Sequence, residues 1–214
     1  SSVTDMGLMF AHCYALTRLE TAGWHTSDVV DMAGMFGHCH SLASIDVASW
    51  DTSSVTDMKV MFAHCRSLAA IDVASWATSS VTDMRGMFFC CLLLSVADVS
   101  SWDVSRVTGC DRMFAGCSKL EDIDVSGWDT SSVKSASEMF ARMGSLRSLA
   151  IGDGWTIKLG ETEPGARRPG KDGGDASLSS IALYDAAGSP VPLANVPLGV
   201  ATTYYLDPYY VPKP

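Results

Sequence analysis

Hydrophobic and polar positions recur along the chain with a period of 26 residues. The dipeptide Met-Phe occurs six times at this spacing, and columns of Cys, Leu and Trp keep the same step. The pairs begin at Met9, Met35, Met61, Met87, Met113 and Met139. A fixed period of this length is typical of repeat proteins, in which each unit is too small to bury its apolar face alone. The pattern therefore predicts coils that stack and cover one another.

In one half of each unit, apolar residues alternate with polar or small ones. Ile71 and Val73 flank Asp72, between Leu68 and Trp76. This alternation predicts a short strand with Ile71 and Val73 facing inward. We expect such strands at residues 44–48, 70–74, 96–100 and 122–126, paired in parallel and in register.

In the other half, apolar residues fall three or four positions apart. From Val55 to Cys65 this spacing predicts two to three turns of helix, with Ser54 as the N-cap and Asp57 in the first turn. Phe62 and its equivalents, together with the preceding Met residues, should be buried between coils. Strand and helix together predict an α/β solenoid of about six coils.

The best-preserved unit, Leu42 to Cys65, reads Leu-x-x-Ile-Asp-Val-x-x-Trp-Asp-Thr-Ser-x-Val-Thr-Asp-Met-x-x-Met-Phe-x-x-Cys. It resembles the bacterial surface protein 26-residue repeat, a relative of the leucine-rich-repeat surface antigens of the BspA-like kind. The resemblance covers roughly residues 1 to 151. It implies a leucine-rich-repeat-like solenoid in a secreted or cell-surface bacterial protein that takes part in adhesion.

Three segments are expected along the chain. Residues 1–151 form the repeat solenoid, and 152–176 hold a last irregular coil and a loop rich in Gly, Pro and charge. Residues 177–214 contain β-branched and aromatic runs, which predict a small C-terminal β cap on the open end of the solenoid. Because the chain begins in mid-unit and shows no anchor, we expect a fragment or processed piece of a longer protein.

Composition narrows the function. Lys and Arg total 15 against 24 Asp and Glu, a net charge of −9, which offers no broad field to attract nucleic acid or anionic lipid. The sequence contains no run of about 18 apolar residues, which is the length that would predict insertion in a membrane. Seven Cys is an odd number, so at least one thiol is free or paired outside the chain. We expect an extracellular monomer without cofactor.

Two columns suggest metal or redox chemistry and also have simpler explanations. The Cys column could form disulfides between stacked coils, but Met143 closes it, which favours small buried side chains. The row His12, His38 and His64 could bind Zn²⁺ or Ni²⁺. Since it continues as Cys90, Gly116 and Arg142, partly exposed residues of the expected helices are the preferred interpretation. No metal site is predicted.

The Trp column has two interpretations. It could form an exposed aromatic platform for glycans, or it could fill the core once per coil. Its recurrence in every unit at the strand end favours the core.

An acidic strip is the candidate binding site. It consists of Asp46, Asp72, Asp98 and Asp124. These residues alternate with inward-facing ones, so they should project outward in a row, beside small residues such as Ala48 and Ser100. Such a strip suits an extended basic partner, although solvated charge on an exposed sheet face is the commoner meaning.

No catalytic constellation occurs, because each candidate His or Asp is one copy of a repeated column. The predicted function is a non-enzymatic adhesion module that presents this strip to a host or bacterial surface protein or glycan. The alternative is a scaffold that positions an enzymatic domain absent from this chain, or a C-terminal part with its own activity.

Overall fold

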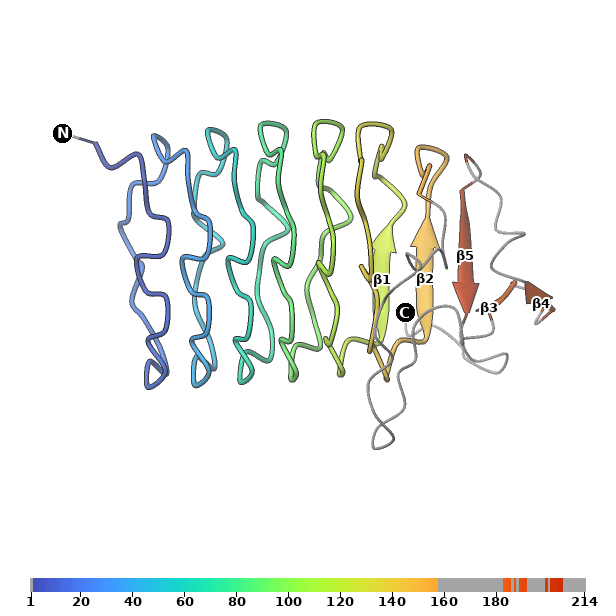
Figure 1. Ribbon diagram of the computed structural model, residues 1–214, viewed down its shortest axis with the longest axis horizontal. Helices are drawn as coiled ribbons and strands as arrows, with labels where there is room; N and C mark the ends of the chain where they lie inside the picture. The colour runs from blue at the N-terminus through green and yellow to red at the C-terminus, as the bar shows by residue number, and fades with distance from the viewer. Residues whose placement is uncertain are drawn as a thin grey trace.

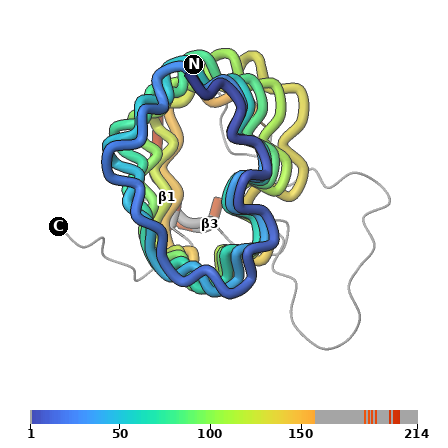
Figure 2. The backbone as a smooth tube through the Cα atoms, turned by 90° about the vertical axis from the view of Figure 1, so that its left-hand side faces the viewer, coloured from blue at the N-terminus to red at the C-terminus, as the bar shows by residue number. Residues whose placement is uncertain are grey.

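The repeat forms a stack of coils, described here from a computed structural model. The structure describes residues 2–157, 183–185, 187, 189–191, 199 and 201–205. Figure 1 shows the coils side by side along the long axis, and Figure 2 shows their oval outlines superposed. Parallel β-bridges join residues 26 apart and run Asp5↔Asp31, Asp31↔Asp57, Asp57↔Asp83, Asp83↔Gly109 and Gly109↔Ser135. We number the units from each Met-Phe pair, so that the fourth unit is residues 87–112.

The predicted helix-plus-strand coil is wrong, and with it the α/β, leucine-rich-repeat-like solenoid. The described residues contain no helix. Val60 and His64 have φ angles of 48° and 61°, in the left-handed region that ends a right-handed helix. Tight turns between these residues, such as Ala63 N–H to Val60 O at 3.1 Å, reproduce the three- and four-residue spacing. The intervening N–H groups donate to the next coil, as Phe62 does to Met87 O at 2.9 Å.

Five short strands form one sheet in the order β1-β2-β5-β3-β4. They are β1 (Asp122–Val125), β2 (Ser148–Ile151), β3 (Leu183–Tyr184), β4 (Pro190–Val191) and β5 (Thr202–Tyr205). β1 and β2 are parallel and in register, whereas β5 is antiparallel to β2. Of the four expected strands, only the one at 122–126 forms, as β1. At 70–74 and 96–100 the described pairing is the single bridge Ala70↔Val96.

Where the expected strands do not form, hydrogen bonds from side chains to backbone carbonyls connect neighbouring coils. The indole Nε1 of Trp76 donates to Val47 O at 3.0 Å, and that of Trp102 donates to Val73 O at 3.0 Å. The hydroxyl of Ser75 donates to Ala48 O at 2.8 Å. Side-chain donors of the next coil thus satisfy these carbonyls, where a continuous parallel ladder would use backbone N–H groups.

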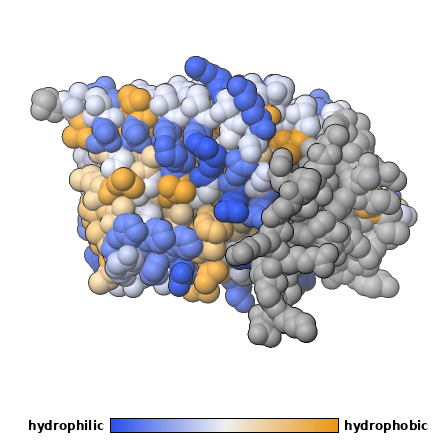
Figure 3. All heavy atoms as spheres, in the orientation of Figure 1, coloured by the Kyte–Doolittle hydropathy of each residue, from blue (hydrophilic) through white to orange (hydrophobic). Residues whose placement is uncertain are grey.

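One apolar core runs through the stack and confirms the predicted burial of Phe62, Phe88, Met61 and Met87, all at 0% exposure. Phe36, Phe62 and Phe88 lie face to face with ring centroids 5.5 and 5.8 Å apart. Outside, hydrophilic and hydrophobic residues alternate in patches over the coils (Figure 3). From Met35-Phe36 onward the units therefore bury their Met-Phe pairs, as the period requires, whereas Met9 of the first unit is 57% exposed.

After β2 the spacing of the repeat is one residue longer. Trp155 comes one position later than the column predicts, yet it is fully buried and its ring lies 6.3 Å from that of Phe140. β5 pairs with β2 beyond this point, with Ala150 opposite Thr203. The loop expected at Gly160–Asp175 lies outside the described residues, and the three-segment division of the chain stays a prediction.

Candidate functional site

The acidic strip is exposed, and each of its carboxylates accepts a hydrogen bond that closes a local turn. Asp46, Asp72, Asp98 and Asp124 are all exposed. In each of them, Oδ1 accepts the N–H two residues on, as in Asp98 from Ser100 at 3.0 Å and Asp124 from Ser126 at 2.9 Å. Ser100 also donates its hydroxyl, and these hydrogen bonds lower the pKa of Asp98. The turn explains the recurrence of Asp here without a ligand, and its hydrogen bonds use Oδ1 of each carboxylate.

A hollow of about 500 Å³ lies over two members of the strip. Val96, Ala97 and Asp98 form one wall, and β1 contributes Asp122 to Asp124. Ser148 and Ala150 of β2 and Thr203 of β5 close the far side. The site therefore has apolar walls, hydroxyl groups and three carboxylates, and none of the described lining residues is basic. The position of this hollow was not predicted from the sequence.

The hollow forms where the fourth unit departs from the repeat. Ala97 stands in a column that otherwise holds Leu19, Ile45, Ile71, Ile123 and Leu149. The smaller side chain removes bulk from that column, and Ala97 lines the hollow. The signal for this hollow in the sequence is a large-to-small change in one apolar column.

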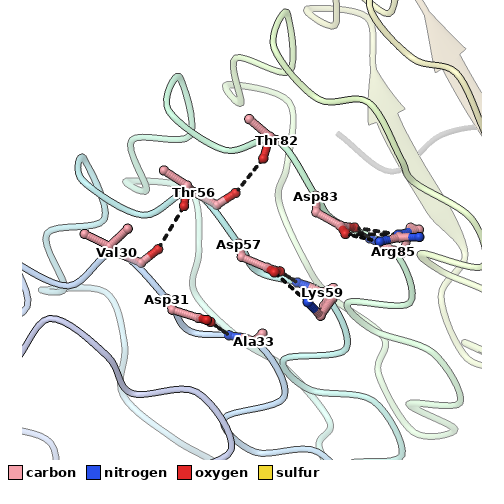
Figure 4. Close-up of polar contacts among 9 residues, drawn as sticks. All are labelled: Val30, Asp31, Ala33, Thr56, Asp57, Lys59, Thr82, Asp83 and Arg85. Carbon is pink, nitrogen blue, oxygen red and sulfur yellow. Dashed lines mark hydrogen bonds and ion pairs between the residues drawn. The ribbon is translucent and has the colours of Figure 1, made fainter.

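A second aspartate column has a structural role. Oδ1 of Asp31 accepts the N–H of Ala33 at 2.7 Å, and Asp57 does the same for Lys59 at 2.9 Å (Figure 4). Lys59 Nζ also lies 2.7 Å from Asp57 Oδ2, and Arg85 pairs with Asp83 in the same manner. These residues therefore act as hydrogen-bond acceptors in turns, and the expected place of Asp57 in the first turn of a helix is wrong.

The three histidines of the predicted row stack on one another. The His12 and His38 ring centroids are 4.7 Å apart, and those of His38 and His64 are 4.5 Å apart. His40 lies beside this row, with its ring 5.9 Å from that of His38. In the part of the chain that the structure describes, no three His, Cys, Asp or Glu side chains are arranged to hold a metal ion.

The stacked imidazoles predict a loss of stability in mild acid. Burial, and then the neighbouring histidines and Arg66, lower the pKa of His38 and His64. A lowered pKa means that the folded chain binds fewer protons than the unfolded chain. The contribution of these two histidines to the stability of the folded chain should therefore be fully present above the ordinary histidine pKa of about 6.5. It should be lost as the pH falls below that value. We expect the melting temperature to decrease between about pH 7 and pH 5.

His38→Asn with His64→Asn is the matched variant, because Asn tolerates the left-handed φ that both residues adopt. Its melting temperature should change less over the same pH range. An equal decrease in the variant would assign the pH dependence to other groups.

From Cys39 to Cys117 the cysteine column is buried, and its thiols have carbonyl partners. Sγ of Cys65 donates to Phe36 O at 3.2 Å, and that of Cys91 donates to Phe62 O at 3.1 Å. Burial raises the pKa of Cys39 to about 11 and that of Cys117 to about 12. A high pKa leaves little thiolate at neutral pH, so these thiols are poor nucleophiles.

We expect thiol reactivity to follow burial. With iodoacetamide at neutral pH, the exposed Cys13 should be modified first, while Cys39, Cys65 and Cys91 should be modified only after unfolding. Mass spectrometry of peptides from the native and unfolded chain measures this directly. Fast labelling of Cys65 or Cys91 in the native chain, or two or more disulfides along the column, would contradict the prediction.

The Trp column is part of the core. Trp50, Trp76, Trp102 and Trp128 are at most 3% exposed. The rings of Trp50, Trp76 and Trp102 stack, with successive centroids 6.3 and 6.2 Å apart. This confirms the core interpretation and leaves no aromatic platform for a glycan at these residues.

Comparison with known proteins places the chain in a repeat family. A family model described as "Mycoplasma protein of unknown function, DUF285" matches residues 1–88 and, in a second overlapping copy, residues 69–158. The chain belongs to this family. Membership of DUF285 is compatible with the resemblance to a bacterial surface repeat. No curated protein and no solved structure matches the chain.

The DUF285 match covers the whole acidic strip and all described lining residues of the hollow except Thr203. Among the described residues, no helix has the length and apolar character to cross a bilayer.

Proposed function

We propose that this DUF285 chain is a non-enzymatic binding module of a bacterial cell surface, of the BspA-like adhesion kind. The acidic strip and the hollow beside it form the contact surface. The partner is a protein or glycan of a host or bacterial surface, and the coils serve as the scaffold.

One observation carries this proposal: Asp98 and Asp124 border an open hollow between two units. These two carboxylates, with no basic residue among the described lining, attract a basic partner at a distance. Neighbouring units add Asp46 and Asp72 at the same position, so the charge continues along the stack. An extended partner can use all four positions, whereas a small metabolite cannot.

The experiment compares two double variants with equal charge. Asp72→Asn with Asp98→Asn removes two strip charges. Asp51→Asn with Asp103→Asn removes two exposed carboxylates that make the same turns, to Ser53 and Ser105, in a different column. Binders are selected from an array of basic peptides and glycans, and association is measured at low and high salt.

The strip variant should slow association about threefold to tenfold and flatten its salt dependence, because surface charges act mainly on the association rate. The control variant should bind at nearly the wild-type rate. Equal effects of both variants would mean that net charge, and not the strip, governs binding.

A further inference from the structure

The fourth unit carries an apolar patch where its neighbours are polar or small. The patch consists of Leu92, Leu93 and Val96, which are 39%, 48% and 59% exposed. The same columns hold Arg66 and Ser118, Ser67 and Lys119, and Ala70 and Asp122 in the units on either side. Exposed apolar residues also occur elsewhere on the coils (Figure 3), as the pair Leu8 and Met9 at the start of the repeat and as single residues such as Val30. Three within five residues of one unit are a local departure from the repeat.

This patch joins the hollow. Val96 belongs to both, and Ala97 next to it also lines the hollow. The buried side chains of Val99 and Ile123 line it as well. Thus two changes in the same unit, polar to apolar at the surface and large to small at Ala97, create one continuous apolar site with an acidic rim.

The extent of the site indicates the size of its occupant. The patch runs from a turn at Leu92 and Leu93 to Val96, at most about 13 Å, and the hollow continues beyond Val96 between the fourth unit and β1. An occupant that covers both must be elongated, with one apolar group in the hollow and others on the patch. A small ligand would fill the hollow and leave the patch exposed.

The charges orient this occupant. Asp98, Asp122 and Asp124 line the hollow, whereas Arg66 and Lys119 stand in the columns of Leu92 and Leu93 at the opposite end of the patch. A basic group is therefore favoured over the hollow and disfavoured at Leu92 and Leu93. Apolar side chains next to a basic one are properties of a polypeptide, not of a neutral glycan.

We infer that the fourth unit anchors an extended polypeptide that places a large apolar side chain in the hollow, further apolar side chains on Leu92 and Leu93, and a basic residue over Asp98 and Asp124. This inference rests on the proposed function and specifies the partner of the same surface. Apolar anchors surrounded by a charged rim are the usual arrangement at such interfaces.

The test restores the repeat in the fourth unit. Leu92→Ser, Leu93→Ser, Val96→Ala and Ala97→Ile introduce the residues that the same columns hold at Ser118, Ser67, Ala70 and Ile71, so the fold should be retained. Ala97→Ile alone fills the hollow and keeps the patch. Val30→Thr is the control, because it removes an exposed apolar side chain elsewhere and matches Thr56 of its column.

The probes are fluorescein-labelled peptides of about twelve residues, long enough to cover the site. One peptide carries Trp and Leu with two Arg. A second replaces Arg by Glu, a third replaces the apolar residues by Ser, and a neutral glucan hexasaccharide represents glycans. Anisotropy should show binding of the first peptide, at least tenfold weaker binding of the other two, and a similar loss for the restored chain. Ala97→Ile should weaken binding in part, and Val30→Thr should leave it unchanged.

Three results would overturn the inference. They are no binding of the first peptide, equal binding by the restored chain, and selective binding of the hexasaccharide that the restored chain loses. If the restored chain binds as well as the wild type, a loss of binding in the Asp72→Asn, Asp98→Asn chain would still support the proposed function. Failure of both variants to affect any binder would contradict the proposed function as well.

Discussion

Replacing Phe62 by alanine should lower the free energy of unfolding by about 3–5 kcal/mol. Phe62 is fully buried, and its ring lies between those of Phe36 and Phe88 and 6.4 Å from that of Trp76. The truncation removes the contacts on both ring faces, and the coils on either side cannot collapse into the space because hydrogen bonds from Phe62 N–H and Phe36 N–H fix their spacing. Urea unfolding followed by circular dichroism measures the loss.

Phe10→Ala is the matched control for this prediction. Phe10 occupies the same column but is only partly buried, with Phe36 and Trp24 as its aromatic neighbours. Its loss should be clearly smaller, because less of the ring is removed from water. A loss below about 1 kcal/mol for Phe62→Ala, or equal losses for the two variants, would show that the Met-Phe column does not hold the stack together.

Burial was the part of the fold that the sequence predicted best. Residues that recur every 26 positions face the same side of successive coils, so the Phe, Cys and Trp columns had to be either all inside or all outside. Their apolar character predicted that they lie inside, and Phe62, Cys65 and Trp76 are indeed buried. The exposure of Asp72 followed from the same alternation, because Ile71 and Val73 on either side of it point inward.

Local conformation was predicted less well, because spacing does not reveal hydrogen-bond partners. Apolar residues three or four apart are typical of a helix, but here two left-handed residues per unit produce the same spacing. Val60 is a β-branched residue, a type that seldom adopts such an angle. The columns of Val60 and His64 contain Gly34, Gly86 and Gly116, also with positive φ, and these glycines were the available signal.

The strand prediction failed for a related reason. Whether a strand forms depends on which groups take its carbonyls, and in this repeat Trp76 and Ser75 do so at residues 47 and 48. The hollow could not be found from the average repeat, since it depends on how one unit departs from that average. Column-by-column comparison, in which Ala97 and Val96 stand out together, is the sequence test that would have indicated it.

The second large effect is expected at Gly152, where the chain takes one extra residue before Trp155. Gly152 directly follows β2, and a Cβ atom added there would lie 1.8 Å from the carbonyl oxygen of Ser126 and 2.7 Å from its carbonyl carbon. Both atoms belong to the backbone, so the clash cannot be relieved by a rotamer change. Gly152→Ala should therefore push the end of β2 away from β1 and cost about 3 kcal/mol.

Gly144→Ala is the control in the same unit. An added Cβ at Gly144 meets no atom within 4 Å, and the residue is exposed. Since alanine restricts the unfolded chain more than glycine does, this variant should be neutral or more stable by up to about 1 kcal/mol. The two substitutions add the same methyl group, so their difference in urea unfolding isolates the contact with Ser126. Equal stabilities would mean that the last coil does not approach its neighbour this closely, and that Trp155 enters the core column by another path.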